Sequence, residues 1–331
     1  MMKNITIVGS GAIGGLLAAR LAKAGVDVSV IDQGVQLEAI QNNGITVHEE
    51  GTNYTQRVKA THSPADLGVQ DLVFVCLKGQ TLAVIAGTLK SLIGPSTKIV
   101  SVMNGIPWWF LHEFGGNLSG HNLSSVDPAG VVSTALPPSQ TFGCVVQLSS
   151  SVAQPGVIRK GAGNRLVVGS ASAGALGESE EIAALLSRAG FDTSATDEVR
   201  RAIWLKLWGN MTMNPISALT RSTSDVILDD PVSEAIVVSI MEEARQVGQQ
   251  YGISIDMSTA ERNASTRKLG SFKTSMLQDV EGDRSLEVDA LLGGPYELAQ
   301  LAGVPTPWLA SIFALVRQLD RNLSKARAKR S

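Results

Sequence analysis

The sequence predicts an α/β amino-terminal half, built on a doubly wound and mostly parallel sheet, followed by an all-α carboxyl-terminal half. Short apolar and β-branched runs alternate with helical patterns up to about residue 195, which is typical of parallel βαβ units. A glycine-rich turn joins the first strand to the first helix. After residue 196 the apolar residues recur at helical spacing and no convincing strand is found. We therefore expect two domains, residues 1–195 and 196–331.

The amino-terminal half starts with a β-branched run at residues 3–9, typical of a buried strand. A helical pattern follows at residues 12–24 and stops at Gly25. Further strands are expected at residues 26–31, 44–48, 71–77, 98–103, 144–149, 157–159 and 165–168. Further helices are expected at residues 36–42, 81–92 and 178–189.

The carboxyl-terminal half shows only helical periodicity. Six helices are expected, at residues 197–219, 231–251, 259–269, 271–280, 285–302 and 306–325. Their apolar faces offer a surface that could pair with a second chain.

Composition excludes several classes of protein. Apolar residues make up 44% of the 331 residues, which is too many for a fully disordered chain. The 28 basic and 30 acidic residues give a net charge of -2, so the basic excess that nucleic-acid binding needs is missing. No run of about 20 mostly apolar residues predicts a membrane span. We expect neither nucleic acid nor membrane as a partner.

Cysteine and histidine usage also restricts the possibilities. Cys76 and Cys144 cannot form a disulfide framework, which is consistent with a reducing compartment and a cytoplasmic location. The four histidines show no ligand spacing, so no metal site is expected.

The glycine-rich turn has the pattern G-x-G-x-x-G directly between a predicted strand and a predicted helix. It comprises Gly9, Ser10, Gly11, Ala12, Ile13 and Gly14. In this context the first glycine permits a tight turn, the second lets the backbone approach a pyrophosphate, and the third lets helix and strand pack closely. The helix start adds N–H donors and a positive dipole end. An ordinary turn or a signal peptide are the alternatives, but the order of strand, glycines and helix favours a Rossmann-type dinucleotide site.

The residue after the second strand bears on the choice of cofactor. Asp32 lies 23 residues after Gly9 and Gln33 follows it. A carboxylate here can accept a hydrogen bond from a ribose 2′-hydroxyl, which favours NAD(H), and no arginine follows to hold a 2′-phosphate. Asp32 could also be a plain turn residue, and Arg57 or Lys59 could reach the site from a later segment.

The first helix of the second half carries a polar row. Lys206, Asn210 and Asn214 are spaced at i, i+4 and i+8, so they share one helix face beside apolar stripes. A lysine on a largely buried helix is costly unless it is paired. A surface lysine with two hydrogen-bonding asparagines is the alternative.

Two residues could complete a site around this lysine. Glu287 lies on a predicted helix and could pair with Lys206, holding an ammonium that polarises and protonates a carbonyl oxygen. Asn104 follows a predicted strand, at the edge of the sheet where ligands bind in open α/β folds. Taken alone, Glu287 could be a solvated helix residue and Asn104 a turn residue.

Together these segments resemble the ketopantoate reductase family (2-dehydropantoate 2-reductases) over nearly the whole chain. The resemblance rests on GSGAIGG at 9–15, LKGQ at 77–80, MNGIPWW at 103–109, WLKLWGNMTMNPISALT at 204–220, KTSMLQD at 273–279 and LEVDAL at 286–291. It implies hydride transfer from NAD(P)H to the C2 carbonyl of ketopantoate, giving pantoate. The resemblance also implies a possible homodimer. The family typically uses NADP(H), whereas Asp32 and Gln33 keep NAD(H) possible.

The resemblance also implies roles for single residues. Lys206 resembles the family's general acid and Glu287 the acidic residue that supports substrate and lysine. Asn104 resembles the asparagine that contacts both cofactor and substrate, and Lys78 a lysine near the cofactor. Asn210, Asn214 and Ser275 match positions that hold the carboxylate and hydroxyl groups of a 2-keto acid substrate.

Two positions depart from the family pattern. Many members have a further substrate-binding asparagine ten residues after the position of Asn214, where this chain has Ser224, and Arg221 lies in a variable stretch. These departures leave room for a related dehydrogenase acting on another 2-keto or 3-hydroxy acid or on an opine-type imine. A non-catalytic nicotinamide-binding sensor is a further alternative, although it has no use for Lys206 and its polar neighbours.

Overall fold

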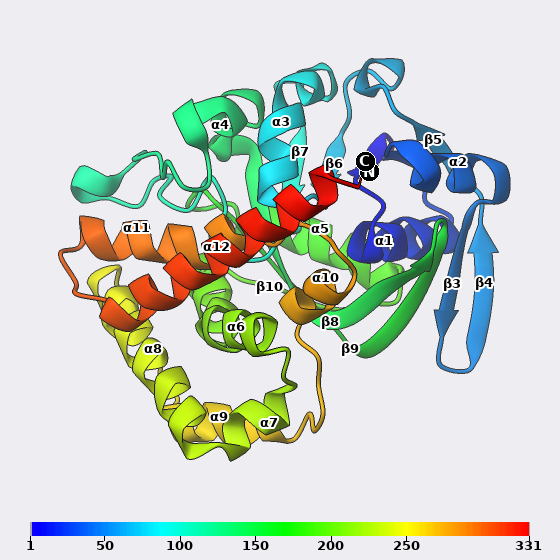
Figure 1. Ribbon diagram of the computed structural model, residues 1–331. Helices are drawn as coiled ribbons and strands as arrows, with labels where there is room; N and C mark the ends of the chain where they lie inside the picture. The colour runs from blue at the N-terminus through cyan, green and yellow to red at the C-terminus, as the bar shows by residue number, and fades with distance from the viewer. Residues whose placement is uncertain (1, 331) are drawn as a thin grey trace. The chain divides into compact units, whose positions relative to one another are not determined.

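The computed structural model describes residues 2–330, and the chain divides into two compact units (Figure 1). Unit 1 contains the residues up to 103 together with 107–199. Unit 2 contains residues 104–106 and the chain from residue 200 onward. A three-residue segment from the first half of the sequence therefore belongs with the helical unit.

Unit 1 is built on one mixed sheet. Its strands are β1 Ile5–Val8, β2 Val28–Ile31, β3 Ile45–Glu49, β4 Thr52–Gln56, β5 Lys59–Thr61, β6 Leu72–Val75, β7 Lys98–Ser101, β8 Thr141–Gln154, β9 Val157–Ser170 and β10 Asp192–Ala195. They lie in the order β4-β3-β9-β8-β7-β6-β1-β2-β5, with β10 beside β9. The strands from β5 to β8 in this order are parallel, while β8–β9 and β3–β4 are antiparallel.

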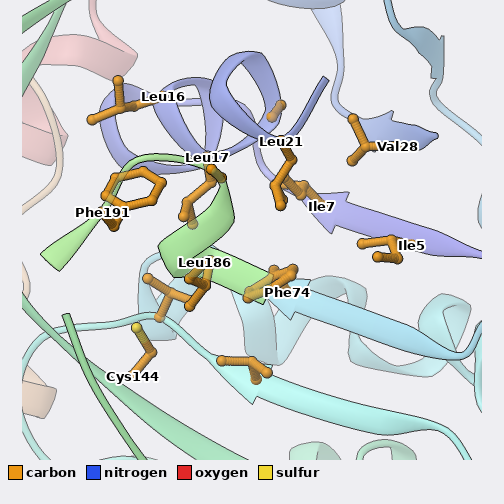
Figure 2. Close-up of a cluster of buried hydrophobic side chains, with 14 of the residues drawn as sticks. Ile5, Ile7, Leu16, Leu17, Leu21, Val28, Phe74, Cys144, Leu186 and Phe191 are labelled. Carbon is orange, nitrogen blue, oxygen red and sulfur yellow. The ribbon is translucent and has the colours of Figure 1, made fainter. Parts of the chain in front are cut away.

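The helices of unit 1 cover this sheet. They are α1 Ala12–Lys23, α2 Gly34–Asn43, α3 Gly79–Leu89, α4 Val131–Ala135 and α5 Leu176–Arg188. Leu17 and Leu21 of α1 pack over Ile7 and Phe74, which come from the central strands β1 and β6 (Figure 2). All four side chains are fully buried, so α1 is fixed against the centre of the sheet.

The sheet differs from the prediction in its longest strands. Three short strands were expected over residues 144–168, but β8 and β9 are two 14-residue strands that form one hairpin, with register shifts along its outer part. The outer half of β8 is polar and partly exposed, so its residues lack the apolar run that marks a buried strand. The strands β4, β5 and β10 were missed because they too are mostly polar or half-exposed.

Unit 2 is helical. Its helices are α6 Val199–Thr220, α7 Ser224–Asp229, α8 Pro231–Gln250, α9 Thr259–Arg267, α10 Ser275–Glu281, α11 Gly294–Leu301 and α12 Pro307–Ala328, with a π-helical turn at Asp289–Gly293. The single helix expected over residues 285–302 is thus shorter and contains this π turn, and α7 was not expected. The predicted fold class, a Rossmann-type α/β half with an all-α half, is confirmed.

Tyr251 ties the end of α8 to α11, because its hydroxyl donates to the Leu298 carbonyl at 2.8 Å in a buried position. Burial raises the pKa of Tyr251 to about 12, above its value of about 10 in an unfolded chain. Between pH 10 and 12 the unfolded chain therefore loses the Tyr251 proton while the folded chain keeps it. The contribution of Tyr251 to the free energy of unfolding is complete below pH 10 and falls as pH rises through this window.

The Tyr251→Phe variant should lose about 1–2 kcal/mol of unfolding free energy at pH 8, because the hydrogen bond is lost. The difference in unfolding free energy between wild type and the variant should then narrow between pH 10 and 12. Urea unfolding across this range measures both effects. A difference that widens as pH rises would contradict the raised pKa of Tyr251.

No helix within residues 2–330 is both long enough and apolar enough to cross a membrane.

Candidate active site

The glycine-rich turn follows β1 directly and has the backbone geometry that a dinucleotide-binding turn needs. Gly9 has φ of +89°, a conformation that favours glycine, and its N–H donates to the Ile31 carbonyl of β2 at 2.8 Å. A Cβ at Gly14 would overlap the Gly9 carbonyl oxygen and lie 2.9 Å from the Cβ of Cys76. A Cβ at Gly11 would meet nothing within 4 Å. Gly14 therefore serves packing, whereas Gly11 faces open space.

The start of α1 is suited to an anion. The helix begins at Ala12 with Gly11 as its N-cap, no side chain caps it, and its first turn contains no acidic residue. Ile13 is half-buried in this first turn. An uncapped helix start beside an open glycine fits a pyrophosphate, which would accept hydrogen bonds from the backbone N–H groups.

Asp32 organises this turn from the end of β2. Its carboxylate accepts from the backbone N–H of Ser10 at 2.6 Å, from the hydroxyl of Ser10, and from the N–H of Gln33 at 2.8 Å. The Gln36 side chain adds a bond to the Ser10 carbonyl at 2.7 Å. Asp32 is therefore more than a plain turn residue, because it holds the fully buried Ser10 in place.

The lysine of the neighbouring strand β5 is set back from this edge of the sheet. Lys59 of β5 is paired with Ser29, so it lies three residues before the position of Asp32 along the parallel strands. Thr61 is the residue of β5 that pairs with Ile31. Lys78 follows β6 as the N-cap of α3, at the same carboxyl edge of the sheet as Gly9 and Asp32.

Unit 2 brings together the polar residues expected around the lysine. The ammonium Nζ of Lys206 donates to Oδ1 of Asn104 at 2.7 Å, and Nδ2 of Asn104 donates to Oε2 of Glu287 at 3.0 Å. A lysine can only donate and a carboxylate can only accept, so these partners fix which way the amide points. Glu287 is 8% exposed, and Asn104 links this buried negative charge to the ammonium.

The position of Asn104 is set by its neighbours in the chain. The N–H of Ile106 donates to the Ala290 carbonyl at 2.8 Å, in the π turn that follows Glu287. Gly105 has φ of +78°, and a Cβ there would overlap the same carbonyl and lie 2.9 Å from the Cβ of Ala290. The absence of a side chain at residue 105 thus allows Asn104 to reach both partners.

The Gly105→Ala variant should be destabilised by about 2–4 kcal/mol, because the methyl group adds a steric overlap to a strained backbone. Its turnover should fall as Asn104 is displaced. Gly252→Ala is the matched control, since Gly252 has φ of +67° but open space around it. Chemical denaturation of both variants separates the steric overlap with Ala290 from the effect of backbone strain. Equal losses of unfolding free energy in the two variants would contradict the role given to Ala290.

The remaining substrate-site candidates lie further along α6 and at the start of α10. Asn214 is 5% exposed, and its Nδ2 donates to the Ser275 hydroxyl at 3.3 Å. Asn210 is half-buried on the same face of α6 as Lys206. Ser224 is buried, and its hydroxyl donates to the Gly270 carbonyl at 3.1 Å. Its side chain thus holds the loop that follows α9.

One residue of this region was not anticipated from the sequence. Arg262 of α9 places its guanidinium against α6 at Gly209, within a helical turn of Lys206. No motif marks an arginine in this position, and only the missing side chain at residue 209 hints at a close approach.

Comparison with known proteins identifies the family. The family pattern described as "Ketopantoate reductase PanE/ApbA" matches residues 5–173, and its carboxyl-terminal counterpart matches residues 198–320. A 2-dehydropantoate 2-reductase of Mesorhizobium japonicum is 40% identical over 321 residues, covering 96% of this chain and 97% of the relative. The chain belongs to the ketopantoate reductase family. It is accordingly an oxidoreductase with a nicotinamide cofactor, in agreement with the shape of the glycine-rich turn.

Solved structures agree with this assignment. The crystal structure of a putative ketopantoate reductase from Ralstonia solanacearum is 44% identical with a TM-score of 0.93, covering 98% of this chain and 99% of that one. A D-mandelate dehydrogenase described with NADH and anilino(oxo)acetate is 20% identical with a TM-score of 0.83, covering 97% of this chain and 99% of that one. The second likeness concerns the fold alone.

Proposed function

We propose that this ketopantoate reductase family member reduces ketopantoate to pantoate, with Lys206 as the general acid. The observation that carries the proposal is the hydrogen-bonded series Lys206–Asn104–Glu287, which holds an ammonium beside a buried carboxylate. The reduced nicotinamide, when bound, supplies a hydride to the C2 carbonyl carbon.

Lys206 supplies the proton that the reaction requires. As C2 gains the hydride, its oxygen gains negative charge, and Nζ donates a proton to it to form the hydroxyl. The lysine is left as a neutral amine and is reprotonated from water. The negative charge of Glu287 favours the ammonium form, so Glu287 prepares Lys206 for the next turnover.

Asn104 keeps the ammonium directed. Its amide oxygen accepts a hydrogen bond from the ammonium of Lys206, which fixes the direction of the lysine side chain. We assign substrate binding to Asn104, Asn210, Asn214 and Ser275. Their amides and hydroxyl can hydrogen-bond the polar groups of a hydroxylated keto acid. Support comes from the contact between Asn214 and Ser275 and from the position of Asn210 on the face of Lys206.

The cofactor is held, in this proposal, by residues 9–14 with Asp32 and Lys78. NADH is the preferred form, because the carboxylate of Asp32 lies at the end of β2 and Lys59 is set back along β5. A 2′-phosphate would meet a negative charge there rather than an arginine.

Under equal conditions kcat/KM should be at least tenfold higher with NADH than with NADPH. The variant Gln33→Arg should shift this ratio toward NADPH, since it adds a phosphate partner next to Asp32. A wild-type preference for NADPH would contradict the assignment of Asp32 and leave the reductase activity in place.

We also propose a homodimer in a reducing, cytoplasmic setting. Trp308 and Leu315 of α12 are 47% and 57% exposed and offer apolar surface to a second copy, and both cysteines are free thiols. Light scattering tests the dimer, and a monomer at working concentration would remove it.

The substrate is tested by steady-state turnover of ketopantoate beside a panel of other 2-keto acids, with and without amines. The expected result is the highest kcat/KM for ketopantoate without amine. A higher kcat/KM for another keto acid would leave the reaction type in place and change the assigned substrate. This is the main alternative, because the hydroxyl of Ser224 already donates to the Gly270 carbonyl. Cofactor binding with no turnover of any keto acid would favour a sensor.

A further inference from the structure

The guanidinium of Arg262 occupies a space that exists only because residue 209 is glycine. A Cβ at Gly209 would overlap Nη2 of Arg262 and lie 3.0 Å from both Cζ and Nε. The guanidinium of Arg262, from α9, therefore lies against α6 at Gly209. Any larger residue at position 209 would push it away.

Arg262 is a half-buried cation without a counter-charge in the part of the chain that the structure describes. Within residues 2–330 it makes neither an ion pair nor a side-chain hydrogen bond, and burial lowers the pKa of its guanidinium. Other arginines of unit 2 do have acidic partners, such as Arg267 with Glu234 and Arg284 with Asp279. Burying an unpaired charge is costly, and an anionic ligand would remove that cost.

The location points to the substrate. Gly209 lies three residues after Lys206 on α6, so the Cβ positions of the two residues are about 5–6 Å apart. Asn210 is the next residue along the helix. The guanidinium thus lies one helical turn from the base of the lysine assigned to the carbonyl oxygen.

We propose that Arg262 binds the carboxylate of the 2-keto acid and thereby selects anionic substrates. This inference rests on the proposed function and extends it. Asn210, Asn214 and Ser275 can donate hydrogen bonds to a carboxylate but are uncharged, and Lys206 is assigned to the carbonyl oxygen. Arg262 would add a positive charge to these neutral donors. The planar guanidinium can hold both carboxylate oxygens at once.

The test compares an anionic substrate with a neutral one of nearly the same shape. Ketopantoate carries a carboxylate, whereas ketopantoyl lactone is its uncharged cyclic ester. In Arg262→Gln the KM for ketopantoate should rise about 10- to 100-fold, as expected for a hydrogen bond between charged groups. Its kcat should change far less, and the kinetics of the lactone should stay near those of wild type.

Two further variants complete the design. Gly209→Ala keeps the charge but displaces the guanidinium, so it should raise the KM for ketopantoate in the same direction. Arg201→Gln is the matched control, because Arg201 is also on unit 2 but is paired with Asp256 at the surface, and it should leave KM unchanged. Equal effects on both substrates, or no effect in either site variant, would overturn the proposal.

A binding measurement separates this proposal from the proposed reaction. Ketopantoate, pantoate and 2-ketoisovalerate should each raise the melting temperature of wild type, and Arg262→Gln should lose most of this shift. If wild type shows this pattern without reducing ketopantoate, the proposed reaction fails and Arg262 keeps its role. If the shift is absent in wild type or unchanged in the variant, the role of Arg262 fails.

Discussion

Replacing Lys206 with alanine should lower kcat for ketopantoate by about 10²- to 10⁴-fold, the range that general acid catalysis contributes. The variant removes the proton donor and also the cation that stabilises the developing alkoxide. Asn104 and Glu287 keep their mutual hydrogen bond, so the fold should be retained. Cofactor affinity, measured by fluorescence titration, should stay within about threefold of wild type, because the glycine-rich turn is untouched.

Lys325→Ala is the control for a lost positive charge, since Lys325 is an exposed residue near the end of α12. It should keep wild-type turnover. If Lys206→Ala were as active as this control, the proton would come from another group. Restored turnover on addition of a small primary amine would support the assignment further.

The second large effect is expected from Gly14→Ala. The new methyl group would overlap the backbone carbonyl oxygen of Gly9 and lie 2.9 Å from the Cβ of Cys76, and neither atom can move without shifting the main chain. Overpacking of this kind should cost about 3 kcal/mol or more of unfolding free energy. The variant should therefore melt well below wild type, which differential scanning calorimetry measures directly.

Gly11→Ala, in the same turn, is the matched control for stability. Its methyl group would enter open space, and its backbone φ of -64° suits any residue. Stability should change by less than about 1 kcal/mol. The Kd for reduced cofactor should rise at least tenfold, because the methyl group stands where a pyrophosphate would approach. A stable variant with unchanged cofactor affinity would contradict the assigned site.

The sequence predicts those parts of the fold whose signal is local. The glycine-rich turn is defined by residues 9–14, and the buried strands around it are short apolar runs. Residues 150–154 of β8 and 160–164 of β9 could not be predicted in the same way, because their strand character comes from pairing between two largely polar segments. The π turn at Asp289–Gly293 was also hidden, because a single π turn within an otherwise α-helical segment leaves the helical pattern on either side of it in place.

In the candidate site too, only the residues with a local sequence signal could be predicted. Lys206, Asn210 and Asn214 could be grouped because helical spacing alone places them on one face. The insertion of Asn104 between Lys206 and Glu287 depends on a three-residue segment that belongs with the helical unit, and no spacing in the sequence shows this. Arg262 was missed because its position depends on a glycine in a different helix.

Isotope transfer tests the central claim most directly. NADH deuterated at both C4 positions is incubated with ketopantoate and the wild-type protein, and the pantoate formed is examined by mass spectrometry and NMR. Proposed hydride transfer predicts one deuterium per product molecule, at C2, whichever face of the ring donates it. Pantoate without deuterium at C2, or oxidation of the cofactor without pantoate, would contradict the account.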